Sequence, residues 1–345
     1  MVDKPLFSLL IITYNQEKYV EEAIRSALTL DYANYEIIIC DDASTDRTFE
    51  IEQKIVDEYS GDVHIELKRS EENLGIGGNF YNAFALSKGE WMVMCAGDDI
   101  SLPDRLKIYE QAIRDNPDSR AFGSCRIIID GEGRERGFCV WGNYIHGASA
   151  FWHRSLFEKF PQIPKGIMAE DALLYLRCFL LGAKVTEIKI PSIKYRIDGL
   201  SESNPQCATF GDIKRKNLRL LKNYYNVLLQ FKADIESFTP PVREEGLVAF
   251  NNAALTRIGG LIAEREEEIH ECLDGSLPQL CKFIFRTFSS PHRKTRLKCI
   301  AARFCPALFR PNFKLDFPEK LPLQKEKYIT YDCREFLNNP IHHCL

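Results

Sequence analysis

Two hydrophobic patterns alternate along the first 130 residues, and this alternation restricts the fold more than any other feature of the sequence. Short apolar runs, typical of strands buried on both faces, are separated by stretches with apolar residues at helical spacing. We expect strands at 7–13, 35–42, 63–69, 90–96 and 121–130, and helices at 17–30, 44–59, 80–88 and from Pro103 onward. This order predicts an α/β fold with a mostly parallel, Rossmann-like sheet and helices on both faces.

The remaining residues suggest further segments. Residues 131–169 are rich in Gly, Pro and aromatic residues and look irregular, whereas 170–182 read as an apolar helix and 184–196 as a strand. Helical and increasingly acidic patterns follow to about residue 272, and the last 30 residues show no clear period. We therefore expect a sheet-based domain at 1–205, a helical region at 206–280 and a basic amphipathic tail at 281–345.

The cysteines and the hydrophobic runs bear on location. None of the 12 cysteines forms a CxxC pair, and several lie inside apolar strand-like runs. Such a pattern favours buried, reduced thiols in a cytoplasmic protein over a disulfide framework. The sequence begins without a signal-peptide pattern and contains no long uncharged apolar run, so we expect no transmembrane helix.

Polar side chains follow three of the predicted strands. The first strand ends in Thr13-Tyr14-Asn15, the second in Asp41-Asp42 and the fourth in Gly97-Asp98-Asp99. Ligands of open parallel sheets bind beyond the carboxyl ends of the strands, so four carboxylates should meet at one edge. Their repulsion would be destabilising unless a cation or hydrogen-bond donors compensate, and oxygen ligands select Mg²⁺ or Mn²⁺. The alternative is that each Asp-Asp pair only forms a turn or a helix cap.

Five segments together resemble family 2 glycosyltransferases of the GT-A fold. They are SLLIITYNQEKYVEEAIRSAL, IIICDDASTDRT, NLGIGGNFYNAF, GEWMVMCAGDD and AEDALLYLRC, and they occur in the family's order between residues 6 and 200. The resemblance implies a GT-A domain, here followed by a C-terminal helical region. It also implies an inverting, metal-dependent transfer of a sugar from a nucleotide-diphosphate donor.

The resemblance also implies roles for individual residues. Thr13 and one of Asp41 or Asp42 would contact the nucleotide base, with Tyr14, Asn15 and Glu17 close by. Gly75 to Asn79 would shape the loop beside the nucleotide, Asp98 would lie near the ribose, and Asp99 would bind the metal ion. Glu170 and Asp171 would face the acceptor. Of the two, the resemblance makes Asp171 the better candidate for the catalytic base. Both residues open a predicted helix, whose dipole favours an ionised carboxylate, and the alternative is that they are only helix N-terminal acids.

One segment, YRIDGLSES at 195–203, departs from the family pattern. Related enzymes often carry a histidine shortly after the Tyr-Arg pair, where this chain has Ile197 and Asp198. A carboxylate could bind a metal ion but repels a diphosphate, so the third metal ligand stays open. Arg196 and Ser201 remain candidate diphosphate contacts.

The stretch 281–315 contains nine Lys/Arg and no Asp or Glu, interleaved with Phe and Leu. This composition is typical of segments that bind anionic membrane surfaces, and we expect a peripheral association with the inner membrane face. Two alternatives are nucleic acid binding, which the acidic remainder of the chain disfavours, and docking on the acidic region 243–271. We expect no nucleic acid partner.

The function predicted from the sequence is the transfer of a sugar to a hydroxyl of a glycan or lipid-linked acceptor. A UDP-sugar donor is favoured, because a carboxylate can accept a hydrogen bond from the uracil imide. A nucleotidyltransferase of related fold is one alternative, although TYNQEK replaces the Gly-rich, basic loop that such enzymes need. A catalytically inactive module that binds nucleotide sugars is the other.

Overall fold

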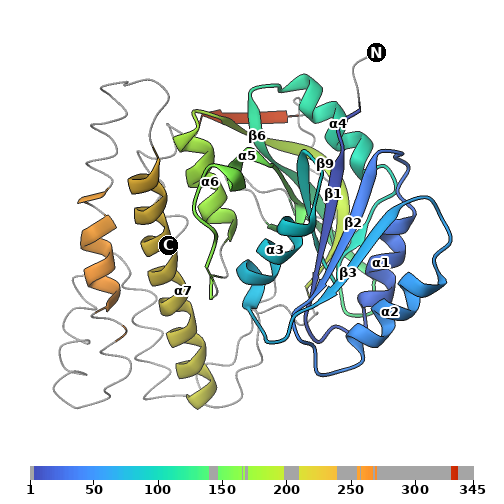
Figure 1. Cartoon of the computed structure of the whole chain (residues 1–345), viewed down its shortest axis with the longest axis horizontal. Helices are drawn as coiled ribbons and strands as arrows, with labels where there is room; N and C mark the ends of the chain where they lie inside the picture. Colours follow the sequence, from blue (N-terminus) through green and yellow to red (C-terminus); the bar gives the residue numbers. More distant parts are fainter. Residues whose placement is uncertain are drawn as a thin grey trace. The chain divides into compact units, whose positions relative to one another are not determined.

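A computed structural model describes residues 4–139, 147–164, 166–167, 170–197, 210–238, 255–256, 258–266, 269 and 328–332. Its centre is one ten-stranded mixed sheet (Figure 1). The strands are β1 (Phe7–Thr13), β2 (Tyr35–Asp41), β3 (His64–Arg69), β4 (Trp91–Ala96), β5 (Ile100–Ser101), β6 (Ser119–Ile129), β7 (Glu135–Cys139), β8 (Ala150–His153), β9 (Lys184–Arg196) and β10 (Tyr328–Asp332).

The sheet has the order β10-β9-β6-β8-β4-β1-β2-β3, with β5 paired to β9 and β7 to β6. The four strands β4, β1, β2 and β3 run parallel to one another, and β6 is parallel to β9. Strand β8 is antiparallel to both β4 and β6 and joins these two parallel blocks. The predicted mostly parallel α/β fold is therefore confirmed.

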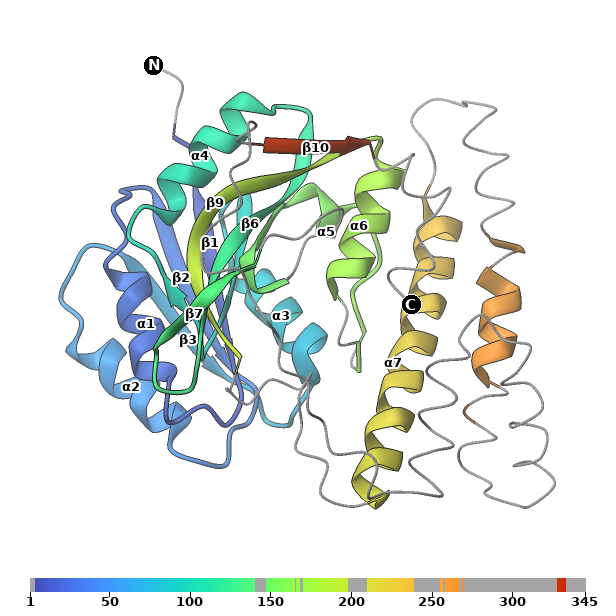
Figure 2. The same ribbon diagram turned by 180° about the vertical axis from the view of Figure 1, so that it is seen from behind.

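Helices cover both faces of the sheet, as Figures 1 and 2 show from opposite sides. One face carries α1, α2 and α4, and the other carries α3, α5 and α6. Their bounds are α1 (Val20–Leu28), α2 (Thr48–Glu58), α3 (Gly75–Leu86), α4 (Arg105–Asp115), α5 (Ser155–Glu158) and α6 (Glu170–Leu180). A short 3₁₀ helix, η1 (Gly147–Ser149), precedes β8, and α7 (Phe210–Ser237) follows β9 along the chain.

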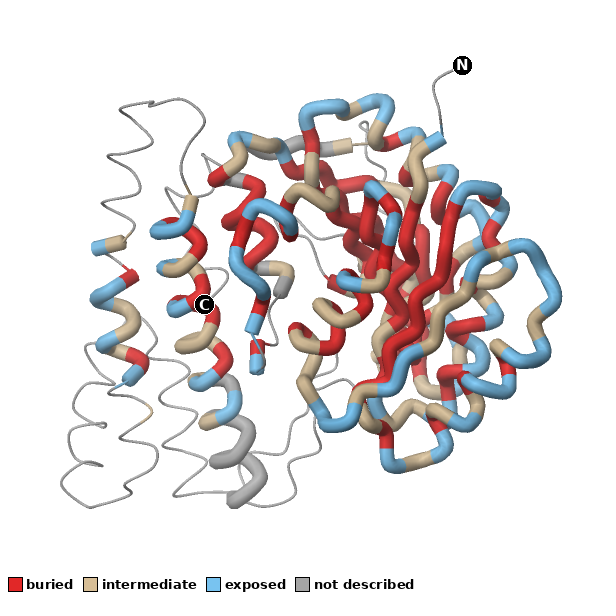
Figure 3. The backbone as a smooth tube through the Cα atoms, in the orientation of Figure 1, coloured by how far each residue is buried: buried red, intermediate tan, exposed pale blue. Residues whose placement is uncertain are grey.

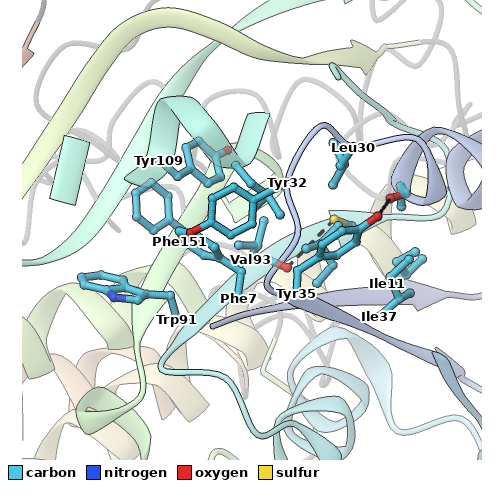
Figure 4. Packing of buried hydrophobic residues seen from close by; sticks show 14 of the residues in the cluster. Phe7, Ile11, Leu30, Tyr32, Tyr35, Ile37, Trp91, Val93, Tyr109 and Phe151 are labelled. Atoms are coloured by element: carbon cyan, nitrogen blue, oxygen red, sulfur yellow. Dashed lines mark hydrogen bonds between the residues drawn. The ribbon is translucent and has the colours of Figure 1, made fainter. Parts of the chain in front are cut away.

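Alternate residues of the parallel strands supply the two halves of the core. Phe7 of β1, Ile37 of β2 and Val93 of β4 point toward the α1–α2–α4 face, where they are fully buried (Figure 4). On the same face, the ring of Phe151 stacks on that of Tyr109, with 4.0 Å between their centroids. Figure 3 shows these strands as continuous buried segments, which is why their sequences read as unbroken apolar runs.

Aromatic contacts bind α3 to α5 on the opposite face. The rings of Phe84 and Phe157 stack with their centroids 4.5 Å apart, and Phe80 lies 5.5 Å from Phe157. All three side chains are buried. Because α3 begins at the edge where the polar strand ends meet, this packing fixes the helix that borders the candidate site.

The described chain divides into two compact units. The first comprises Met1–Glu202, Ala233–Val242 and Phe317–Leu345, and the second comprises Ser203–Lys232 and Arg243–Asp316. The first unit is thus built from three separate stretches, which the sequence analysis did not anticipate. Strand β10 is one cause, since it pairs antiparallel with β9 although the end of the chain showed no strand pattern. No helix in the described residues has both the length and the apolar character needed to cross a bilayer.

A buried ion pair attaches the end of α7 to α6 within the first unit. The Arg177 guanidinium donates to both carboxylate oxygens of Asp234, at 2.6 and 3.1 Å, and neither side chain is exposed to solvent. Arg177 also donates to Leu156 O at 3.1 Å and Pro161 O at 2.7 Å. A buried pair with these additional acceptors ties the last turn of α7 to α6 and to the segment after α5.

We expect Asp234→Ala to destabilise the first unit by about 3–5 kcal/mol, because it leaves the Arg177 charge buried without its carboxylate partner. Chemical denaturation of the full chain measures the change. Asp118→Ala is the matched control, since Asp118 pairs with Lys184 at 3.1 Å on the surface. This control should cost less than about 1 kcal/mol, and equal losses in the two variants would contradict a structural role for the buried pair.

Candidate active site

The carboxyl ends of β1, β2 and β4 meet at one edge of the sheet. Thr13 at the end of β1 pairs with Asp41 at the end of β2, and Ile12 pairs with Ala96 at the end of β4. The N–H of Gly97 continues this alignment by donating to Ile12 O at 3.2 Å. The structure therefore brings both predicted acidic strand ends to the same edge, one on each side of Thr13.

Hydrogen bonds between side chains and backbone join the loops that follow β1 and β2. The N–H of Asn15 donates to Ser44 Oγ at 2.9 Å, and Asn15 Oδ1 accepts from the N–H of Thr45 at 2.8 Å. Glu17 Oε2 accepts from the N–H of Arg47 at 3.0 Å. Asn15 and Glu17, both expected near the nucleotide, thus use these oxygens to hold the two loops together.

The same loops contain two non-glycine residues with left-handed backbone. The φ angle is 52° at Asn15 and 60° at Ala43. Asparagine tolerates this region, whereas alanine pays roughly 1–2 kcal/mol for it. Strain of this kind persists where neighbouring hydrogen bonds fix the conformation. Between the bonded loops, Tyr14 is 43% exposed and Thr13 only 2%, so the Tyr14 ring is the more accessible of these two predicted contacts.

Asp42 caps α3 from a distant part of the chain. Its two carboxylate oxygens accept from the N–H groups of Leu74 and Gly75, at 2.7 and 2.8 Å. The prediction of a turn up to Asn79 and a helix from Phe80 was wrong, because α3 already begins at Gly75. The cap lies more than 30 residues earlier in the sequence, so the local pattern did not reveal it. Asp42 acts here as a helix cap.

Asp41 is fully buried and has its own protein partners. Its Oδ1 accepts from the N–H of Ser44 at 3.0 Å and lies 3.4 Å from Arg69 Nε. Arg69 also donates to Ser44 O at 2.7 Å and stacks over the ring of Phe49. Sequence reasoning missed Arg69, although it ends β3 in register with Asp41. Asp41 Oδ2 is buried and has no hydrogen-bond partner among the described residues.

The first turn of α3 contacts both β2 and the segment that leads to α6. Asn79 Nδ2 donates to Cys40 O at 2.7 Å, so this predicted loop residue ties α3 to the end of β2. The N–H of Gly77 donates to Ile167 O at 2.9 Å. A Cβ at position 77 would lie 2.7 Å from the same oxygen, which only glycine avoids. Ile167 precedes α6 by three residues, so the predicted donor and acceptor sides are joined here.

Asp98 and Asp99 are buried side by side at the end of β4, with 8% and 6% exposure. Burial raises the pKa of Asp98 to about 6, and burial together with the charge of Asp98 raises the pKa of Asp99 well above its usual value. Asp99 Oδ1 accepts from the N–H of Arg196 at 3.0 Å, whereas Oδ2 has no partner among the described residues. The charges of Arg196, near Asp98, and of Arg126 and Arg105, near Asp99, only partly offset the effect of burial.

Arg196 fixes the backbone around this pair. Its Nε donates to Asp98 O at 3.0 Å, its Nη1 to Asp130 O at 2.9 Å and its Nη2 to Glu22 Oε2 at 2.8 Å. The side chain is 2% exposed. We therefore interpret Arg196 as a residue that positions Asp98 and Asp99 rather than as the predicted diphosphate contact.

The acceptor side is described only in part. Asp171, in the first turn of α6, is half-buried. The side chain of Glu170, and Asp198 and Ser201 entirely, lie outside the described residues.

Comparison with known proteins identifies the family and the fold. The sequence model described as Glycosyl transferase family 2 matches residues 8–159. The putative glycosyltransferase EpsE of Bacillus subtilis (strain 168) is 30% identical over 210 residues, which cover 56% of this chain and 74% of EpsE. The chain belongs to glycosyltransferase family 2. Its predicted GT-A fold and its predicted family are both confirmed.

Two further proteins are similar to this glycosyltransferase. The UDP-Glc:alpha-D-GlcNAc-diphosphoundecaprenol beta-1,3-glucosyltransferase WfgD of Escherichia coli is 31% identical over 127 residues, 37% of this chain and 48% of WfgD. The mannosyltransferase PcManGT from Pyrobaculum calidifontis, solved with GDP-Man and Mn²⁺, has a TM-score of 0.50 at 18% identity. That match covers 88% of this chain and 87% of PcManGT, and it supports the fold.

Among the described residues, Asp98 and Asp99 fit a divalent cation. Hydrogen-bond donors, the other form of compensation expected from the sequence, already serve Asp42, and Arg69 pairs with Asp41. Within the described ranges, no three His, Cys, Asp or Glu side chains are grouped to hold a metal ion. Mg²⁺ and Mn²⁺ are often held by one or two carboxylates, with phosphate and water oxygens completing the shell. The free Oδ2 of Asp99 suits such an ion.

Gly97 allows the β4 end to approach β1 closely. A Cβ at this position would lie 2.6 Å from Thr13 Cγ2 and would also collide with the Gln16 side-chain oxygen. We expect Gly97→Ala to lower the free energy of unfolding by about 1–3 kcal/mol, because Thr13 must move. We also expect it to weaken nucleotide binding. Denaturation and calorimetric titration with UDP and Mn²⁺ measure the two effects.

Gly259→Ala is the control for this substitution. A Cβ at Gly259 would meet nothing within 4 Å, and the residue lies in a helical stretch. Alanine should therefore be neutral or slightly stabilising there. A Gly97→Ala variant that binds UDP as well as the control would contradict the close approach of β4 to β1.

Proposed function

We propose that the chain is a metal-dependent, inverting glycosyltransferase that moves a sugar from a nucleotide-diphosphate donor to a hydroxyl of its acceptor. The observation that carries this proposal is the buried Asp98-Asp99 pair, whose unpartnered oxygen follows the end of β4, the strand that pairs with β1. A divalent ion at this pair would offset the negative charge that develops on the departing diphosphate. Family membership supports the donor class.

Asp41 is the better candidate of the two acids for the nucleotide base. Both oxygens of Asp42 already cap α3, whereas Asp41 retains Oδ2. A carboxylate oxygen can accept the imide hydrogen of uracil or the corresponding hydrogen of guanine. Arg69 covers Asp41 with a side chain that is 47% exposed, so it can move aside when a base enters.

Asp171 is the proposed general base. It lies in the first turn of α6, where the helix dipole favours the ionised carboxylate that must accept the acceptor hydroxyl's proton. The acceptor hydroxyl, which gives its proton to this base, would attack the anomeric carbon from the face opposite the diphosphate. The new bond to the acceptor oxygen would form as the bond to the diphosphate oxygen breaks, which inverts the anomeric centre. Glu170 at the helix start is the second acceptor-facing candidate.

The relatives favour a hexose donor and a lipid-linked acceptor. WfgD is a glucosyltransferase that, by its name, uses UDP-Glc and an undecaprenol-linked sugar diphosphate. PcManGT was solved with a GDP-sugar, so the fold accommodates a second base. We propose a UDP-sugar as the donor and a growing glycan as the acceptor. Undecaprenyl-diphosphate sugars are the first acceptors to test.

We expect Asp99→Asn to abolish the stabilisation of the protein by UDP with Mn²⁺, because the amide no longer supplies an anionic ligand. Thermal-shift measurements with UDP and GDP, with and without Mn²⁺ or Mg²⁺, provide the test. Glu132→Gln is the control, since Glu132 is an exposed acid on the β6–β7 turn. An absence of any nucleotide effect on the unmodified chain would refute the proposed donor site.

We expect Asp171→Asn to retain UDP binding but to lose at least 100-fold in sugar transfer, which is the usual contribution of a general base. Donor hydrolysis and transfer assays under identical conditions separate the two effects. If the chain were an inactive binding module, the unmodified protein would show no metal-dependent turnover. That outcome would reject the enzymatic function in favour of the binding module.

We propose further that the stretch 281–315, which lies outside the described residues, holds the enzyme at an anionic membrane surface. Its nine basic residues would each contribute about 1 kcal/mol near such a surface. The full chain should float with phosphatidylglycerol vesicles at low salt and should not float with neutral vesicles. Replacing the basic residues of 293–298 by Gln should reduce flotation, and a lack of flotation at low salt would reject the idea.

A further inference from the structure

Glu52 is a buried acid that the proposed reaction does not use. It lies on α2 between Thr48 and Ile55, on the face of the helix that is turned to the protein interior, and its side chain has no exposed surface. Neither of its carboxylate oxygens has a hydrogen-bond partner among the described residues. A carboxylate in this position would lack both water and a protein donor, which is a costly state.

The groups around Glu52 belong to the nucleotide edge of the sheet. Thr13 lies beside its carboxyl group, where its hydroxyl lowers the pKa of Glu52, although less than burial raises it. The same hydroxyl donates to Cys40 O at 3.3 Å. The charged groups that act on Glu52 are Asp41 on β2, Asp46 in the following loop and Arg69 on β3, and the Cys40 thiol is also coupled to it. Arg69 is already engaged with Asp41.

Two unsatisfied acidic groups thus share one buried region. Asp41 Oδ2 lacks a donor, and Glu52 lacks both donors and solvent. A buried carboxyl group close to another acid favours its own protonated form. Burial, with added effects of Asp41 and Asp46, raises the pKa of Glu52 to about 8. Glu52 is therefore the member that keeps the proton at neutral pH.

We propose that Glu52 is a positioning residue: as a neutral carboxylic acid it donates its hydrogen to Asp41 Oδ2 and so fixes the Asp41–Thr13 end of the nucleotide site. This inference rests on the proposed function, because Asp41 and Thr13 are its contacts to the donor. With Ser44 and Arg69 at Oδ1 and Glu52 at Oδ2, the Asp41 carboxylate has a defined orientation before a base arrives. A base that bonds Oδ2 then shares an oxygen that is already aligned.

Three variants separate the proton from the shape of the side chain. Glu52→Gln keeps a hydrogen-bond donor but cannot ionise, and Glu52→Leu keeps the volume but has no donor. Glu50→Gln is the control, since Glu50 is exposed on the same helix and pairs with Arg47. Calorimetric titration of each full-length variant with UDP and Mn²⁺ is carried out from pH 6.5 to pH 9.

At pH 6.5 we expect Glu52→Gln and Glu50→Gln to bind UDP within about twofold of the unmodified chain, and Glu52→Leu to bind about tenfold more weakly. At pH 9 the unmodified chain should bind about tenfold more weakly than Glu52→Gln, because Glu52 has ionised. The uracil imide titrates equally with both proteins. The ratio of their UDP affinities therefore reports the ionisation of Glu52 alone. Normal binding by Glu52→Leu, or an equal alkaline loss in Glu52→Gln, would overturn the proposal.

The pH dependence of stability without ligand independently tests whether Glu52 is protonated in the folded protein. A folded-state pKa near 8 exceeds the ordinary value of 4.5, so the folded protein binds more protons than the unfolded chain between these values. The midpoint denaturant concentration of the unmodified chain should therefore fall, relative to Glu52→Gln, as the pH rises from 4.5 to 8. If the midpoints of the unmodified chain and of Glu52→Gln changed equally with pH, Glu52 would not be protonated in the folded protein. If the unmodified chain binds neither UDP nor GDP, the proposed function fails as well, and this profile still shows whether the proton is present.

Discussion

Repulsion among carboxylates at one edge of the sheet is the constraint on which the candidate site depends. Parallel pairing of β1 with β2 and β4 brings the ends of these strands into register, so Asp41 and Asp42 lie on one side of Thr13 and Asp98 and Asp99 on the other. An arrangement of this kind folds only if each negative charge is offset locally. The way each one is offset distinguishes structural acids from acids that remain available to a ligand.

The four aspartates receive different compensation. Asp42 accepts two backbone N–H groups and becomes the cap of α3. Asp41 has Ser44 and Arg69 at one oxygen and, in our proposal, the hydrogen of Glu52 at the other. Asp99 accepts a single backbone N–H and keeps Oδ2 without a partner among the described residues. In our proposal this pair binds the cation, and the diphosphate would then lie on the β4 side of Thr13.

Much of this arrangement was predictable from hydrophobic periodicity. The strands β1, β2 and β4 have no exposed face, so their sequences showed them as apolar runs, and parallel pairing then implied a common edge. The start of α3 was not predictable, because its cap comes from Asp42 across the fold. Arg69 and Glu52 carried usable signals. Arg69 ends a strand next to Asp41, and Glu52 shares a helical face with Ile55, where an acid is unexpected.

Contacts made by backbone atoms cannot be read from residue types, and they explain the coupling of the two halves of the site. Asp42 holds the first N–H groups of α3, and Gly77 in the same turn donates to Ile167 just before α6. Arg177 then anchors α6 to Asp234 at the end of α7. In our proposal, a nucleotide sugar that orders the loop before α3 would act through Gly77 and Ile167 on the segment that leads to α6, and so on the placement of Asp171.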